Sequence, residues 1–461
     1  YILSFANKSA TETEIIMSMS INQHFTPVKL IRFAAPSILM MIFMSLYTIV
    51  DGIFISRFIG SNALSSLNIV FPVINIAIAI STMLATGGNA IISKYLGEGR
   101  RREASECLTM FVVVTVSASI VIMVLTFAFL TPISRLLGAT DILLEDCRSY
   151  LATAIAFAPA CMLQALFQSY LVTAGLPALG LCLTVIAGIL NAVLDYIFIV
   201  VLGLGIGGAA AATGIGQCVP AAAGLIYFTF IGKTIHFTRF HLRIKELLAA
   251  CYNGSSEMVT QLSNAVVTFL FNMVMMRLAG ENGVAAITIL LYGQYLFNAF
   301  YLGFTIGISP VVGFQFGAKR KNELKNIYRV SFIFVMCSSL LLTLAAIRLS
   351  TPIVSVFTHD AGTFALASSG FRIFAFNFLF SGFNIASSGF FTALSNGRVS
   401  AVISFARTLV FTVLSLLILP QIIGINGAWT AIPAAEFLTL ILSAGMHLKY
   451  FIRNNKYNYF E

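Results

Sequence analysis

The chain is patterned into long apolar runs separated by short polar segments. Twelve runs are long enough to cross a bilayer core of about 30 Å as helices, and they lie near residues 30–55, 63–92, 105–130, 145–172, 177–201, 206–231, 252–277, 283–312, 328–350, 365–394, 399–422 and 427–451. Gly175–Pro177 and Gly203–Gly205 predict tight turns that make two helical hairpins. The pattern therefore predicts an all-α integral membrane protein with twelve transmembrane helices.

Composition supports a membrane protein and argues against a nucleic-acid-binding one. Of the 461 residues, 59% are hydrophobic and 10% are charged, whereas soluble domains carry about 25% charged residues. The net charge of +10 comes from basic residues placed between apolar runs rather than on one polar domain. The seven cysteines are scattered without metal-binding spacing, so we interpret them as small core hydrophobes.

The placement of lysine and arginine predicts the orientation in the membrane. If both termini are cytoplasmic, the cytoplasmic side holds 20 of these residues and the opposite side holds 5. Cytoplasmic loops carry an excess of basic residues, so this bias predicts that both termini face the cytoplasm.

The chain also contains an internal repeat. A shift of 220 residues aligns several pairs of glycines, charged residues and a Thr-Pro step: Arg57 and Arg277, Gly60 and Gly280, Gly87 and Gly307, Gly97 and Gly317, Glu103 and Glu323, and Thr131-Pro132 and Thr351-Pro352. Six helices in each half is an even number, so the halves are predicted to be parallel repeats. We expect a polar N-terminal segment (1–25), an N-lobe (26–231), a basic cytoplasmic linker (232–250), a C-lobe (251–451) and a C-terminal tail (452–461).

Two acidic residues of the N-lobe are the main candidates for chemistry. Asp195 lies inside the fifth apolar run, with Asn191 one turn earlier on the same helix face. Asp51 lies near the outer end of the first run. Acidic groups within membrane spans are rare and tend to be functional, so we expect the pair to bind a coupling ion. The alternatives are that Asp51 caps a helix end near Arg57 and that Asp195 makes a structural hydrogen bond.

Proline at position 36 is a candidate hinge. Proline removes a backbone hydrogen bond and can kink a helix, and a kink at Pro36 would let Asp51 swing toward or away from Asp195. The alternative is a static kink with no moving part.

Several motifs together resemble one transporter family. They are VDGIFISRFIG around Asp51, GGNAIISKYLGEGRRREA, NAVLDYIFIV followed by GLGIGGAAAAT, and ISPVVGFQFGAKRKNE. From about Thr26 to Lys449 the chain resembles the multidrug and toxic compound extrusion (MATE) transporters, within their bacterial multidrug-exporter branch. The resemblance implies a V-shaped, two-lobed antiporter of the bacterial cytoplasmic membrane, driven by H⁺ or Na⁺ and exporting lipophilic, often cationic, drugs.

The resemblance also implies an ion-coupling set. The family's helix-one aspartate, helix-five Asn-x-x-x-Asp and helix-six threonine fall on Asp51, Asn191, Asp195 and Thr213. A low dielectric disfavours the charged form of a carboxyl group, so such a site can bind a proton, and Na⁺ would use the same oxygens. The sequence does not distinguish H⁺ from Na⁺ as the coupling ion. No other cofactor and no resident metal are expected.

Other polar residues in apolar runs are weaker candidates. Tyr47, one turn before Asp51, and Gln168 are predicted to line the cargo pocket, and Gln294 and Asn298 form an i,i+4 pair that could serve cargo or bond two helices. Glu436 is expected to hydrogen-bond across the C-lobe rather than to couple ions.

Other functions for a membrane protein of this kind agree less well with the sequence, and a sensory or structural role would leave the intramembrane acids on a duplicated scaffold unexplained. A flippase for lipid-linked sugars of the same superfamily would need basic residues lining its cavity, and Arg407 is the only basic residue well inside a run. A membrane enzyme would need converging histidines, acids or metal ligands at one face, and the sequence offers none. We therefore expect a transporter rather than an enzyme, working as a monomer on small molecules.

Overall fold

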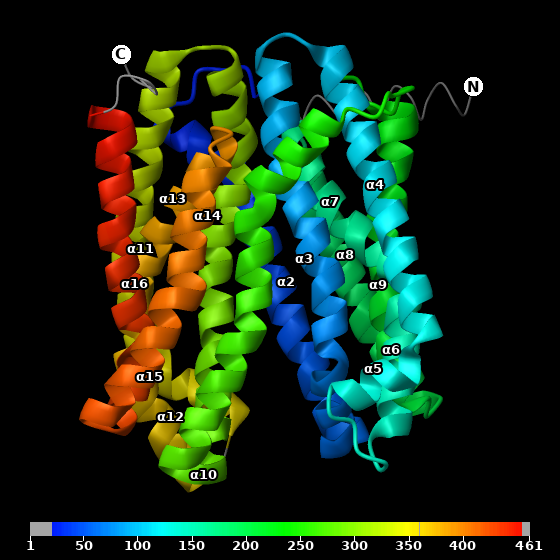
Figure 1. Cartoon of the computed structure of the whole chain (residues 1–461), viewed down its shortest axis with the longest axis vertical. Coiled ribbons are helices and arrows are strands. Elements are labelled where there is room, and N and C mark those ends of the chain that lie inside the picture. Colours follow the sequence, from blue (N-terminus) through cyan, green and yellow to red (C-terminus); the bar gives the residue numbers. More distant parts are fainter. Residues whose placement is uncertain (1–20, 359, 454–461) are drawn as a thin grey trace.

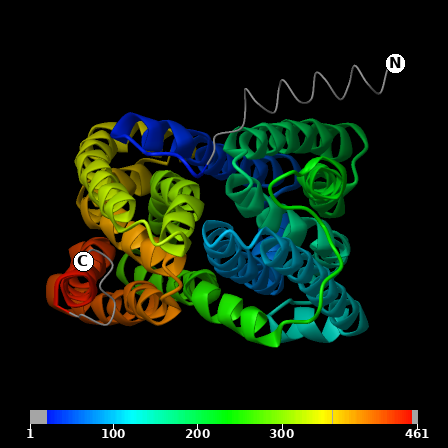
Figure 2. The same ribbon diagram turned by 90° about the horizontal axis from the view of Figure 1, so that it is seen from above.

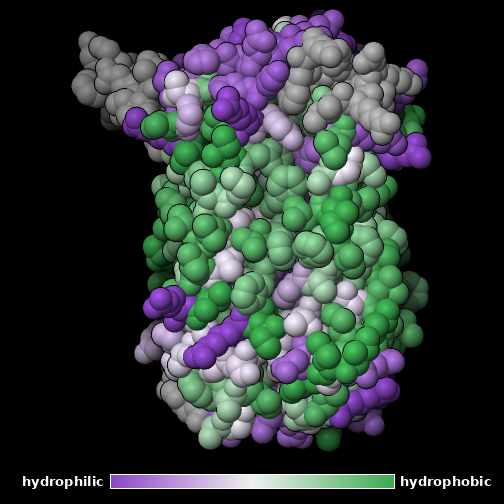
Figure 3. Space-filling model, turned by 90° about the vertical axis from the view of Figure 1, so that its left-hand side faces the viewer, coloured by the Kyte–Doolittle hydropathy of each residue, from purple (hydrophilic) through white to green (hydrophobic). Residues whose placement is uncertain are grey.

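The computed structural model describes residues 21–358 and 360–453, which fold almost entirely into helices. Two bundles of long helices lie side by side and are joined by a segment that crosses between them (Figures 1 and 2). On the face shown in Figure 3, hydrophobic side chains cover the middle of the molecule, and polar residues gather toward its two ends. This distribution is the one expected for a protein that spans a bilayer.

The first bundle, the N-lobe, holds six spans. They are α2 (Pro27–Phe54), α3 (Ser61–Gly97), α4 (Arg101–Ala128), the pair α6 (Leu144–Ala156) and α7 (Ala158–Thr173), α8 (Pro177–Asp195) with the π-helix η2 (Tyr196–Val201), and α9 (Gly205–Ile226) with η3 (Tyr227–Ile231). The short helix α5 (Leu130–Leu136) follows α4, and the π-helix η1 (Ile55–Ile59) follows α2. The pair α6 and α7 is one span with a bend of 51°.

The second bundle, the C-lobe, begins with α10 (Ile244–Gly317). This helix makes two spans, because Gly280 in its middle has the non-helical dihedrals φ 62° and ψ −148°. The remaining elements are α11 (Lys321–Phe357), α12 (Ala361–Phe374) with η4 (Ala375–Asn377) and α13 (Phe378–Ala393), α14 (Gly397–Phe405) with η5 (Ala406–Phe411) and α15 (Thr412–Ile423), and α16 (Ile425–His447) with η6 (Leu448–Arg453). Over the described residues the twelve predicted spans are thus confirmed.

The backbone confirms the parallel repeat at positions where the chain turns. Positive φ angles recur at matching places in the two halves: Gly60 and Gly280, Gly99 and Lys319, and Gly175 and Ser395 at a shift of 220, and Gly205 and Gly424 at a shift of 219. Two of these positions hold residues other than glycine, so the recurrence reflects the backbone path rather than the glycines alone. The predicted turns at Gly175 and at Gly203–Gly205 are also confirmed.

The two lobes meet through glycines near the end where α3 and the second half of α10 finish. A Cβ atom built on Gly87 of α3 would lie 1.9 Å from the backbone oxygen of Ala250 in α10. The repeat-related residue Gly307 faces Ala34 of α2, where a Cβ would lie 2.9 Å from the Ala34 Cα. Gly303 packs against the same part of α2. The backbones are therefore in direct contact, and this end of the molecule is closed.

The closed end also carries the linker and the basic loops. Residues 232–243 have no regular helix, and α10 takes over at Ile244, so the last part of the predicted linker is helical. The linker lies on the start of α4, where the Arg243 Nη2 donates to the Glu106 Oε2 at 2.6 Å and the His236 N–H donates to the Ser105 Oγ.

The N-terminal segment differs from the expectation within its described part. Residues 1–20 lie outside the described residues. The segment was expected to be polar, whereas its described part includes Ile21 and Phe25, two hydrophobic side chains that are buried. Phe25 packs edge-on against Phe33 of α2, and its carbonyl accepts a hydrogen bond from Asn326 at the start of α11. Residues 21–25 therefore contact the C-lobe. Most of the predicted C-terminal tail also lies outside the described residues, and the domain boundaries stay a prediction.

Candidate ion-coupling site

The two acidic residues singled out in the sequence lie together in the N-lobe. Asp51 belongs to the last turn of α2 and Asp195 is the last residue of α8, and each is followed by a π-helix within four residues. Their carboxyl groups are close enough to interact electrostatically. Asp195 is 1% exposed, and in both residues the Oδ1 atom is buried without a partner. Since two ionised carboxylates in contact repel, this arrangement favours a proton or small cation between them.

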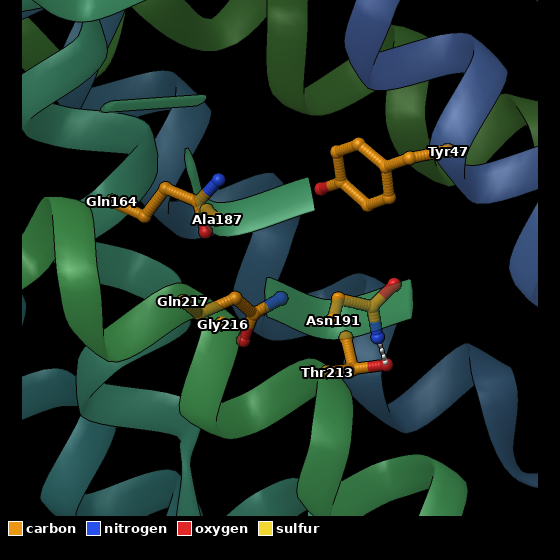
Figure 4. A pocket seen from close by; sticks show the side chains of 7 residues that line it. All are labelled: Tyr47, Gln164, Ala187, Asn191, Thr213, Gly216 and Gln217. Carbon is orange, nitrogen blue, oxygen red and sulfur yellow. Dashed lines mark hydrogen bonds between the residues drawn. The ribbon is translucent and has the colours of Figure 1, made fainter. Parts of the chain in front are cut away.

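Asn191 and Thr213 extend this pair into a polar row. The amide Nδ2 of Asn191 donates to the Thr213 Oγ1 at 3.2 Å (Figure 4), and Asn191 lies within the electrostatic environment of Asp195. Asn191 lies one turn before Asp195 on α8, and Thr213 lies on α9. The structure thus brings together all four residues of the predicted ion-coupling set, from three different helices.

A small cavity adjoins this row. Seven residues line it: Tyr47, Gln164, Ala187, Asn191, Thr213, Gly216 and Gln217 (Figure 4). Its volume is about 10 Å³, which is about the space that one water molecule needs, whereas pockets for drug-sized ligands measure about 300–1,000 Å³. The cavity therefore suits a water molecule or a small ion and is too small for an organic cargo.

Tyr47 and two glutamines set the shape of the cavity. The Tyr47 side chain reaches in from α2 toward Gln164 of α7, and the Oε1 atom of Gln164 is buried without a hydrogen-bond partner (Figure 4). Gln217 lies on α9, one turn after Thr213. Neither glutamine was predicted from the sequence. The signal that could have identified them is their spacing, because Gln217 lies four residues after Thr213 and Gln164 lies four residues before Gln168.

The other predicted cargo residues lie away from this cavity. Gln168 is buried, and its Nε2 donates to the Thr184 Oγ1 at 3.1 Å between α7 and α8. In the C-lobe, Asn298 accepts a hydrogen bond from Ser381 of α13 at 3.1 Å. Gln294 is half-buried on α10. For Asn298 the observed contact is the helix-to-helix bond that was the alternative to a cargo role.

Pro36 and Glu436 complete the set of sequence candidates. α2 runs as one continuous helix through Pro36, which lies in the same turn as the interlobe contact at Ala34. Glu436 of α16 accepts a hydrogen bond from Asn384 of α13 at 2.7 Å, so the expected bond across the C-lobe is confirmed. Among the described residues, no three His, Cys, Asp or Glu side chains form a metal-binding group.

Comparison with known proteins places this geometry in a family. The chain is 21% identical over 444 residues to the multidrug export protein MepA of Staphylococcus haemolyticus, covering 92% of this chain and 93% of that protein. It is 24% identical over 342 residues to the uncharacterized transporter YisQ of Bacillus subtilis, covering 69% and 71%.

Solved structures share the fold. One is the outward-facing conformation of a multidrug resistance MATE family transporter of the MOP superfamily, with TM-score 0.87, 23% identity and coverage of 92% of this chain and 97% of that one. Another is a MATE in complex with MaL6, with TM-score 0.87, 22% identity and the same coverage. The MatE family model matches residues 36–197 and 258–417, one stretch in each lobe. With both halves matched, this chain belongs to the MatE family of membrane transporters.

Proposed function

We propose that this protein is a multidrug exporter that moves lipophilic, often cationic, small molecules out of the cell in exchange for H⁺ or Na⁺. The observation that carries the proposal is the buried contact between Asp51 and Asp195 beside an ion-sized cavity. The names of the related proteins support export of drugs as the activity.

The coupling follows from the electrostatics of the pair. Two unit charges about 4 Å apart at an effective dielectric of about 20 interact by about 4 kcal/mol. This exceeds the coupling of about 1–3 kcal/mol that links sites in typical allosteric proteins. A cation that binds between Asp51 and Asp195 therefore relieves enough repulsion to favour one arrangement of α2 and α8 over another. When the cation leaves, the uncompensated negative charge of the two carboxylates attracts a cationic cargo.

The cargo itself needs more room than the small cavity offers. We propose that it binds between the lobes and that they alternate between a state closed at the basic end and a state open there. Both termini would be cytoplasmic, because α2 begins and η6 ends at the end where the basic loops gather (Figure 1). The protein would act as a monomer in a bacterial cytoplasmic membrane.

A lipid-linked-sugar flippase is less well supported. Such a protein needs free basic side chains in its cavity to hold phosphate. Arg407, the basic residue deep within a described span, is instead paired with Glu436 at 3.5 Å.

The test is drug efflux from proteoliposomes under a pH gradient or a sodium gradient imposed separately. We expect one gradient to drive efflux of a lipophilic cation, and Asp195→Asn to abolish the driven component, because the amide takes up no proton and lacks the negative charge that attracts Na⁺. Asp51→Asn should behave in the same way. Asp141→Asn is the matched control, because Asp141 is an exposed loop residue paired with Arg135. Full gradient-driven efflux by Asp195→Asn would exclude this residue from coupling.

A further inference from the structure

The N-lobe cavity has a counterpart in the C-lobe. Under the internal repeat, Gln164 corresponds to Asn384 and Ala187 to Arg407 at a shift of 220, and Gln217 corresponds to Glu436 at the shift of 219 found in this region. Three residues that line the N-lobe cavity are thus replaced by an amide, a guanidinium and a carboxylate.

These three counterparts converge in the structure. The Asn384 Nδ2 donates to the Glu436 Oε2 at 2.7 Å, and the Arg407 Nη1 lies 3.5 Å from the Glu436 Oε1. They come from α13, η5 and α16, the repeat equivalents of α7, α8 and α9. The Arg407 side chain therefore lies at the C-lobe position that corresponds to the small cavity of the N-lobe.

The C-lobe cluster is well shielded from solvent. Asn384 is 0% exposed and Glu436 is 4% exposed, while the Arg407 side chain is 12% exposed. Buried charges are stable only when they are paired, so the carboxylate of Glu436 requires a cation beside it. In the N-lobe the corresponding position is the methyl group of Ala187, which supplies no charge.

A second carboxylate responds to the same arginine. Glu257 of the first half of α10 lies within the electrostatic reach of Arg407, as Glu436 does. The Arg407 guanidinium therefore has two carboxyl groups in its electrostatic environment, and it contacts that of Glu436 directly.

We propose that Asn384, Arg407 and Glu436 form a second cation site, in which the protein's own guanidinium is the resident cation. The site accepts a monovalent, planar cation of the guanidinium class when the Arg407 side chain is removed. In the intact protein Arg407 occupies the C-lobe site, which therefore does not exchange its cation. The proposal concerns the C-lobe alone and does not depend on the proposed drug export.

Chemical rescue tests this proposal. Arg407→Ala leaves Glu436 without its cation, so the purified variant should unfold at a lower temperature than the parent. Millimolar guanidinium, well below denaturing concentrations, should raise its unfolding temperature in a saturable way, and sodium at equal ionic strength should raise it less. The parent protein and Arg372→Ala, a variant of the exposed arginine in the last turn of α12, should show no such shift. The double variant Arg407→Ala with Glu436→Gln should lose the response.

Equal effects of guanidinium and sodium, or a guanidinium response that persists in the double variant, would overturn the proposal. If Arg407→Ala does not fold, Arg407→Lys and Arg407→Gln decide the matter. Lysine keeps a cation and glutamine keeps a polar side chain without charge, so Arg407→Lys should be the more stable variant. Equal stability of these two would overturn the proposal in the same way.

Discussion

Replacing Gly87 by alanine adds one methyl group where the two lobes touch. The new Cβ would lie 1.9 Å from the Ala250 backbone oxygen and 2.8 Å from the Gly254 backbone nitrogen. A carbon and an oxygen in close contact are about 3.3 Å apart, so α3 and α10 must separate by about 1.4 Å at this point. Both partners are backbone atoms within continuous helices, so no side-chain rotation can relieve the clash.

The cost falls on one state of the transporter. Overpacking of this kind costs about 1–3 kcal/mol, which corresponds to a change of about 5- to 150-fold in a two-state equilibrium. The clash exists only while the basic end is closed and disappears when the lobes part there. Gly87→Ala should therefore shift the population toward the state open at the basic end. Gly254→Ala, whose Cβ would lie 1.9 Å from the Met83 oxygen, should do the same.

Distances between spin labels measure this shift. Labels at Arg100, between α3 and α4, and at Lys319, between α10 and α11, report the separation of the lobes at the basic end. The native cysteines must first be replaced, because Cys182 and Cys337 are exposed. We expect a longer-distance population in Gly87→Ala.

The control is Gly445→Ala, which meets no atom within 4 Å and gains only the helix propensity of alanine. Distance distributions in Gly87→Ala and Gly254→Ala identical to those of the parent would refute the reasoning.

Three further substitutions test the site and the fold. Thr213→Val removes the acceptor of the Asn191 amide. An unsatisfied buried polar group costs about 1–3 kcal/mol. The concentration of the coupling ion that half-saturates transport should therefore rise by about 5- to 150-fold. Glu106→Gln weakens the contact with Arg243, and trypsin should then cut the linker faster in a timed digest. Backbone hydrogen bonds at the start of α12 lower the pKa of Asp360. The charged carboxylate therefore stabilises the fold at a pH above the usual aspartate pKa, and this stabilisation is lost as the pH falls through the lowered pKa. Asp360→Ala should reduce the unfolding temperature at pH 7, and it should reduce it less in acid.

The fold could be predicted because a bilayer leaves few choices. Backbone groups in hydrocarbon must bond internally, so each long apolar run becomes a helix. Gly60 and Gly280 mark equivalent turns of the two repeats, because both take φ values that suit glycine. Asp51 and Asp195 could be found for a related reason, since a carboxyl group inside an apolar run has few structural uses.

The details of the site depend on the rotation and depth of the helices, which hydropathy does not specify. Gln164 and Gln168 lie on the same face of α7, one turn apart, yet only Gln164 reaches the cavity. The pairing of Arg407 with Glu436 likewise joins α16 to the helix before it. The sequence alone does not show that this ion pair corresponds to the N-lobe cavity, because the correspondence depends on both the internal repeat and the position of the cavity.

α2 is the element that can connect the ion site to the closed end. Asp51 lies in its last turn, and Ala34 in its second turn packs on Gly307 of the other lobe. Pro36 lies beside this contact and leaves one backbone carbonyl of the helix without its usual partner. A change of helix direction at Pro36 would therefore alter the contact between the lobes as well as the position of Asp51. The repeat-related helix α10 has Ser256 at this position. Of the two helices, α2, which carries Asp51, is therefore the one whose turn at the interlobe contact is weakened by a proline.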